Sequence, residues 1–390
     1  MRLPLLSAVF ILLPLLLGAC ASTPPLARNG TEFQDHLFQP PAHPVRSQDI
    51  LSVSQEMQHF LTHEVAHSVR NNGLRRGLYN ALTNGWLTID YDTEITKNAS
   101  ETFQTRSGNC LSLVLMTAAL AKQLDLKVDY QNVFLEDSWT QADNLYIATG
   151  HVNVIIGKRP SHYDAEMDNY NILIIDFSPA QQAIRQKSES ITEARVLSMY
   201  LNNRAVELLS TGNINDAYWY IKEAIRQDPA FYAAYNTLGV VYRRHGDILQ
   251  AEQIFREILQ ASPDNVIALS NLQETLEKSA HYAEADSIAQ RLHKLQPHPP
   301  FYFLNLAKAE MQHGNLTQAK NFIEKEIQRD PYNDESHFLL AQIHYQLGEM
   351  SNVEKQLLLA RENSSTRKTY DLYSSKLNFL KAQASISPIK

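Results

Sequence analysis

A 34-residue spacing organises the second half of this 390-residue chain. Prolines, glycines and alanines each recur at that spacing: Pro229, Pro263, Pro297 and Pro331; Gly212, Gly246, Gly314 and Gly348; Ala217, Ala251, Ala285 and Ala319. Ala280 occupies the position of the missing glycine. A fixed period of about 20 to 50 residues indicates stacked repeat units, because each unit buries its apolar face only against its neighbours. The period therefore predicts a solenoid in this half of the chain.

Each unit has the features of two packed helices. Gly239 and Ala251 are small enough to let the helices approach closely, and Gly246 can end the first helix at little cost. Pro263 cannot continue the second helix. The full pattern, Tyr235-x2-Leu238-Gly239-x2-Tyr242, Ala251-x3-Phe255 and Pro263, resembles the tetratricopeptide repeat. The resemblance implies an all-α array of about five repeats in residues 195–365, followed by a capping helix and tail in 366–390.

Such an array has no catalytic chemistry of its own, and its concave groove is expected to bind an extended peptide or a partner protein. Asn202 and Asn236 are 34 residues apart, so they are candidates to hydrogen-bond the backbone of that partner. The alternative for both asparagines is an ordinary solvated polar position.

The N-terminus predicts export and lipid anchoring. Arg2 precedes an apolar run over residues 5–17, which is short for a membrane span and typical of a signal peptide. The run ends in LGAC, which resembles the lipobox of bacterial lipoproteins. The resemblance implies removal of residues 1–19 and acylation of Cys20, and Ala21 resembles the sorting rule for the outer membrane. We expect a lipid-anchored protein of the outer membrane that faces the periplasm; a plain secretory signal is the alternative.

Composition limits the structures and the partner classes that are expected for the rest of the chain. Residues 20–47 contain five prolines among polar residues, which predicts an extended tether. A net charge of -7 and a pI near 6.1 give no basic footprint for nucleic acid. The length accommodates two domains, so a separate domain is expected over residues 48–190.

This domain has the pattern of an α+β fold. Helical patterns cover residues 55–69, 73–83 and the apolar run 110–124. Short runs rich in β-branched and aromatic residues follow, at 128–134, 151–156 and 171–177. Helices followed by an antiparallel sheet are therefore predicted.

Cys110 is the candidate nucleophile of the domain. The chain has two cysteines, and lipidation of Cys20 leaves Cys110 without a partner in an oxidising compartment. Gly108 and Asn109 form a turn before it, so Cys110 is expected to begin a helix. The positive end of a helix dipole favours a thiolate, and backbone amides there can form an oxyanion hole. A buried, inert cysteine is the alternative.

His151 and Asp176 are the candidate base and its orienting carboxylate. If 151–156 and 171–177 pair as a hairpin with Ile156 opposite Asn171, His151 stands opposite Asp176. A thiolate nucleophile needs such a base, and the base needs a group that fixes its tautomer.

Residues 101–177 resemble the transglutaminase-like fold, a papain-related group with a Cys-His-Asp triad. The similar segments are Arg106-x-Gly108-x-Cys110, His151-Val-Asn-Val and Asp176-Phe-Ser-Pro. The resemblance implies that Cys110 attacks an amide bond of a protein or peptide substrate, with His151 as base and Asp176 as orienter. Hydrolysis of the acyl-enzyme is favoured over transfer, and no cofactor is expected. Gln104 and Gln131 are candidate oxyanion donors, with structural roles as the alternative.

Two other functions are compatible with the sequence. His63-Glu64-Val65-Ala66-His67 fits the H-E-x-x-H pattern of zinc proteases, although no third ligand is evident and no metal is expected. The chain could instead be an inactive outer-membrane scaffold that works through its repeats alone.

Overall fold

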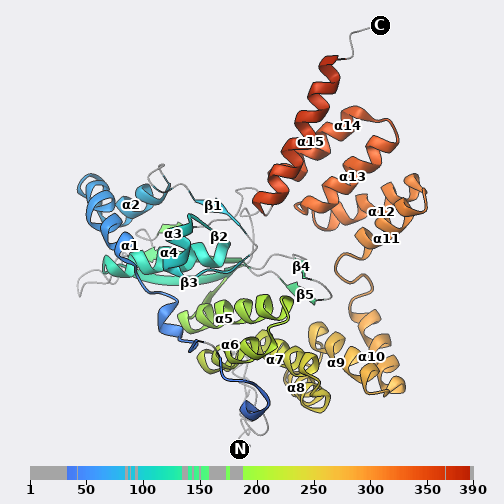
Figure 1. Cartoon of the computed structure of the whole chain (residues 1–390), viewed down its shortest axis with the longest axis horizontal. Helices are drawn as coiled ribbons and strands as arrows, with labels where there is room; N and C mark the ends of the chain where they lie inside the picture. The colour runs from blue at the N-terminus through green and yellow to red at the C-terminus, as the bar shows by residue number, and fades with distance from the viewer. Residues whose placement is uncertain are drawn as a thin grey trace, which may run out of the picture.

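The computed structural model describes residues 33–41, 43–83, 87, 89–92, 95–133, 139–142, 145–148, 151–157, 173–175, 188–364 and 366–386. An N-terminal part of helices and strands precedes a curved series of helices (Figure 1). Cys20 and Asp176 lie outside the described residues. Within the described ranges, no helix is both long and apolar enough to cross a bilayer.

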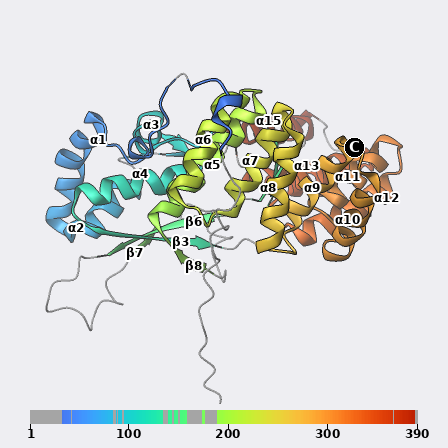
Figure 2. The same cartoon turned by 90° about the horizontal axis from the view of Figure 1, so that it is seen from below.

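The N-terminal part is built around α4 (Cys110–Gln123), in which every residue from Leu111 to Ala121 is buried. A four-stranded antiparallel sheet packs against it in the order β7 (Leu173–Ile175), β6 (His151–Gly157), β3 (Lys127–Val133) and β8 (Ser188–Ile191). Figure 2 shows α1 and α4 on the same side of this sheet. The predicted buried helix is confirmed, and the described residues of the three predicted strands, 128–133, 151–156 and 173–175, lie in strands.

Apart from α2, the remaining elements of this part are short. They are η1 (Asp35–Leu37), η2 (Ser47–Asp49), α1 (Gln55–Phe60), the π-helical turn η3 (Leu61–Val65), α2 (Ala66–Thr83), β1 (Asp90–Tyr91), α3 (Ala99–Thr105), β2 (Ser107–Gly108), β4 (Trp139–Ala142) and β5 (Leu145–Ala148). Gly73 interrupts α2 with φ = 74°, where the sequence predicts the start of a second helix.

The predicted register of the β6–β7 pair is wrong by two residues. The structure pairs Val154 with Ile175 and Ile156 with Leu173, whereas the prediction places Val154 opposite Leu173. A shift of two residues keeps every side chain on its face of the sheet, so the alternation of apolar residues cannot distinguish the two registers. The predicted opposition of His151 and Asp176 therefore has no support from the described pairing.

Five helix pairs follow, as the 34-residue period predicts. The leading helices of the pairs are α5 (Glu193–Ser210), α7 (Tyr232–His245), α9 (Val266–Lys278), α11 (Tyr302–Gln312) and α13 (Asp334–Gln346). The trailing helices are α6 (Ile214–Gln227), α8 (Ile248–Ala261), α10 (Tyr282–Leu295), α12 (Leu316–Arg329) and α14 (Met350–Glu362). The helix α15 (Arg367–Ile386) packs on α14 and covers the end of the array.

A close contact in the second pair explains the small residue at position 239. A Cβ atom on Gly239 of α7 would lie 2.5 Å from the ring of Phe255, which is fully buried on α8. Glycine lets α7 and α8 approach around this ring, as the sequence predicts.

The array is interrupted between α10 and α11 (Figure 1). One apolar core runs from the N-terminal part to Ala285 of α10, and a separate core begins at Phe301. On α10 only Ala285 is fully buried, whereas α8 buries four residues. Helices α5–α10 therefore form a first lobe and α11–α15 a second lobe.

Local sequence explains the interruption. Asn265 caps the start of α9, and Asn333 caps the start of α13. At the equivalent repeat position before α11 the chain has Pro299, which Pro300 follows. Phe301 has φ = 60°, and α11 starts only at Tyr302.

The missing asparagine cap of α11 is replaced by a side chain from α12. The carboxylate of Glu326 accepts hydrogen bonds from the backbone N–H groups of Phe303 at 3.1 Å and Leu304 at 3.2 Å. Burial raises the pKa of Glu326. The equivalent position is apolar in the other repeats. Here an acidic residue is buried because it accepts hydrogen bonds from the backbone N–H groups at the start of α11.

The described part of the predicted tether does not extend freely. Phe38 stacks on Tyr218 of α6, with ring centroids 3.9 Å apart, and Asp35 accepts hydrogen bonds from Tyr218 and Lys222. The indole of Trp219 donates to the carbonyl of Gln39 at 2.6 Å. Residues 33–41, the strap, therefore dock on the first lobe because aromatic burial and an ion pair offset the lost chain entropy.

Acid is expected to release the strap. Burial alone would raise the pKa of Asp35, but hydrogen bonds from Lys222 and Tyr218 lower it below its ordinary value. A lowered folded-state pKa stabilises docking above the unfolded pKa of about 3.9, and this contribution is lost as the pH falls below that value. Asp35→Asn should release the strap even at pH 7, measured as a red shift of Trp219 emission, whereas Asp49→Asn should not. Unchanged emission in Asp35→Asn would contradict the role of this ion pair.

Candidate functional site

Cys110 begins α4, as predicted, and its side chain is partly exposed. Asn109 caps the helix by accepting from the backbone N–H of Ser112 at 2.9 Å. Gly108 is required before it, because a Cβ there would lie 2.7 Å from the Cβ of Ser112. The thiol thus lies at the start of α4, at the positive end of the helix dipole.

The topology brings His151 to the same end of the domain as Cys110. After α4 the chain turns and returns along β3, and the last residue of β3, Val133, pairs with His151. The fourteen residues of α4 and the seven of β3 have similar lengths, about 21 and 23 Å. His151 is buried. The structure therefore places two of the three predicted catalytic residues at one end of the α4–sheet layer, and Asp176 lies outside the described residues.

A hydrogen-bond network links the Cys110 turn to the first repeat helix. The amide of Asn109 donates to the hydroxyl of Thr96 at 2.9 Å, and the backbone N–H of Thr96 donates to Glu207 of α5 at 2.7 Å. Burial raises the pKa of Glu207, although Thr96 and Arg204 both oppose that change. The sequence carries no local signal for this link, because Thr96 and Glu207 are 111 residues apart.

The two candidate oxyanion glutamines lie in different settings. Gln104 is exposed on α3, and Gln131 is partly buried on β3 opposite Asn153. No contact with Cys110 is described for either side chain, so their roles stay predictions.

The two histidines of the H-E-x-x-H pattern contact side chains and backbone of neighbouring residues in their own helical segments. His63 lies in the π-helical turn, stacks on His59 with centroids 3.9 Å apart, and has its Nδ1 atom 3.0 Å from the His59 carbonyl. His67 lies in α2, with its Nδ1 atom 3.4 Å from Arg70. Across the described ranges, no group of three or more His, Cys, Asp or Glu side chains is arranged to hold a metal ion.

Asn202 and Asn236 are both buried in the first lobe. The Oδ1 atom of Asn202 accepts from Thr237 at 2.7 Å, whereas Oδ1 of Asn236 has no hydrogen-bond partner in the structure. Direct contact with a partner stays a prediction for both, and their burial counts against it in this conformation.

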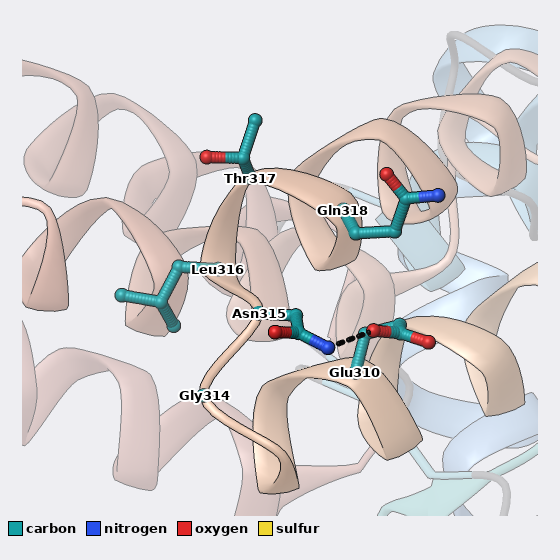
Figure 3. A pocket seen from close by; sticks show the side chains of 6 residues that line it. All are labelled: Glu310, Gly314, Asn315, Leu316, Thr317 and Gln318. Carbon is teal, nitrogen blue, oxygen red and sulfur yellow. Dashed lines mark hydrogen bonds between the residues drawn. The ribbon is translucent and has the colours of Figure 1, made fainter.

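Two hollows lie in the second lobe. The first, of about 590 Å³, lies at the α11–α12 turn and is lined by Glu310, Gly314, Asn315, Leu316, Thr317 and Gln318 (Figure 3). Asn315 donates to Glu310 at 2.7 Å there, and most of the lining is exposed and polar. The second, of about 400 Å³, is a groove between the leading helices α11 and α13. Its lining mixes apolar, amide and charged side chains: Lys308, Met311, Gln312, Glu335, Phe338, Leu339, Gln342 and Gln346.

Comparisons with known proteins agree with the repeat architecture. Residues 173–340 match the family model described as the Psidin N-terminal TPR repeats region. TPR repeat-containing protein PA4667 of Pseudomonas aeruginosa is 27% identical over 154 residues, which cover 39% of this chain and 25% of that protein. TPR repeat-containing protein YvcD of Bacillus subtilis is 33% identical over 70 residues, covering 18% of this chain and 14% of that protein.

The solved structure of pilF from Pseudomonas aeruginosa is 22% identical and covers 48% of this chain and 92% of its own, with a TM-score of 0.27. This chain spans a quarter or less of the length of the two curated relatives. The family-model match over residues 173–340 identifies a region of tetratricopeptide repeats in this chain, and the matches name no activity for it.

Proposed function

We propose that the protein is an interaction protein whose tetratricopeptide repeats bind a protein or peptide partner along the leading helices. The observation that carries the proposal is the open groove between α11 and α13, which only leading-helix side chains line. Stacked repeats of this type present extended concave surfaces, and a groove of about 400 Å³ is large enough for part of a peptide.

We also propose that the chain is anchored to the outer membrane through Cys20 and faces the periplasm. The support is the LGAC sequence after an apolar signal. Twelve residues lie between Cys20 and Phe33, where the described strap begins, so the two residues can be at most about 45 Å apart. A lipid at Cys20 would thus keep the first lobe close to the membrane.

A second candidate function is amide-bond chemistry at Cys110 by a transglutaminase-like domain. The specific support is that Cys110 begins α4 and that His151 begins β6, a strand that packs against α4. The thiolate would attack a substrate carbonyl, His151 would protonate the departing amine, and water would release the acyl group. Asp176 is the proposed orienter of His151. In this case the repeats would bring a protein substrate to the domain.

Site-specific photo-crosslinking tests the interaction function. A benzophenone amino acid replaces Gln342 in the groove, or Gln328, which is exposed on the trailing helix α12, as the matched control. The groove position should give a discrete adduct in cells, and the control should not. Equal adducts at both positions, or none in the groove, would contradict the proposal.

A further inference from the structure

We propose that the groove of the second lobe binds an extended, uncharged peptide segment that carries one large apolar side chain. This inference rests on the proposed interaction function and specifies its ligand. It assigns the binding to α11 and α13, because the array is interrupted before α11 and the groove is built only from these two leading helices.

Glutamines recur along the groove at the repeat spacing. Gln312 on α11 and Gln346 on α13 are 34 residues apart, and both are exposed in its lining. Packed helices lie about 8–10 Å apart, and an extended peptide rises about 3.3 Å per residue. The two amides therefore match backbone groups about three residues apart in a bound strand. An amide both donates and accepts hydrogen bonds, as a peptide backbone requires.

The charged side chains of the groove pair with each other and leave no net charge for a charged ligand. The only charged lining residues, Lys308 and Glu335, form an ion pair with a distance of 2.7 Å. Their charges compensate each other across α11 and α13. A charged side chain placed in the groove would lose hydration without gaining an opposite charge, which is unfavourable.

The apolar part of the groove suits a single large side chain. Met311, Phe338 and Leu339 supply it. The ring of Phe338 lies 5.0 Å from that of Tyr373 on α15, whose hydroxyl donates to Asp334 at 3.2 Å. The end helix thus fixes the wall of the groove, and a thioether beside it adapts to different apolar shapes.

Positions equivalent to Phe338 differ in burial along the array. Phe338 lies four repeat lengths after Asn202 and three after Asn236, both of which are buried. At the other equivalent positions Ser270 on α9 is exposed and Leu304 on α11 is buried, whereas Phe338 is partly exposed and lines the groove.

Fluorescence anisotropy with the full chain tests the inference. The probe is a fluorescein-labelled octapeptide of serine and threonine with one central leucine, and two matched probes carry aspartate or lysine in its place. The leucine peptide should bind, and the charged peptides should bind at least about tenfold more weakly. Gln312→Ala combined with Gln346→Ala should weaken the leucine peptide about tenfold, whereas Gln328→Ala should leave it unchanged.

A charge introduced into the groove gives a second, gain-of-function test. Gln342→Lys should reverse the preference, so that the aspartate peptide binds more tightly than the leucine peptide. Absence of leucine-peptide binding, equal binding by the double alanine variant, or no reversal with Gln342→Lys would each overturn the inference. If crosslinking from position 342 still captures a partner, only the ligand assignment fails; if it captures none, the proposed function fails as well.

Discussion

Replacing Phe255 with alanine is expected to lower the free energy of unfolding of the first lobe by about 3–5 kcal/mol. The ring is fully buried, and its edge fills the space that Gly239 leaves between α7 and α8. Alanine leaves a cavity that the two helices cannot close without moving. Urea unfolding followed by circular dichroism measures the loss.

The matched control is Leu249→Ala on the same helix. Leu249 is 75% exposed, so its replacement should change the unfolding free energy by no more than about 0.5 kcal/mol. Because the lobes have separate apolar cores, the transition of the second lobe should stay in place in Phe255→Ala. One cooperative transition that shifts as a whole would contradict the two-lobe architecture.

Replacing His151 with alanine is expected to slow alkylation of Cys110 by iodoacetamide about tenfold or more at neutral pH, if the domain supports thiol chemistry. A neighbouring imidazole accepts the proton of the thiol and leaves the reactive thiolate. The rate is measured by mass spectrometry in a chain with Cys20 replaced by serine, so that Cys110 is the only thiol.

His67→Ala is the control for this experiment, because His67 is exposed on α2. Its alkylation rate should equal that of the parent. Slow alkylation that does not depend on His151 would contradict amide-bond chemistry at Cys110. The protein would then be a scaffold that acts through its repeats.

The repeat array is predictable from sequence because its information is local and periodic. Small residues at 239 and 251 and the proline at 263 each act within one helix pair, so their spacing alone gives the architecture. The buried helix at 110–123 is predictable for the same reason, since its apolar run is continuous.

The sequence does contain a signal for the interruption of the array, but the unbroken 34-residue period draws attention away from it. Pro299 and Pro300 replace residues that cap and begin the corresponding helices, yet the period of 34 continues through them. The register of β6 and β7 had no such signal, because two registers bury the same side chains.

Contacts between distant segments were not predictable from patterns. The strap has the prolines of a tether, and only its apolar residues Phe33, Leu37 and Phe38 hint at docking. The link from Thr96 to Glu207 depends on the placement of α5 against the N-terminal part, which no short sequence pattern encodes.

Hydrogen–deuterium exchange of the chain purified with its partner tests the central claim, that the partner binds along the leading helices. We expect slower exchange in α11 and α13 upon binding, with exchange in the trailing helices α12 and α14 unchanged. Protection confined to the trailing helices or to the N-terminal part would contradict the claim.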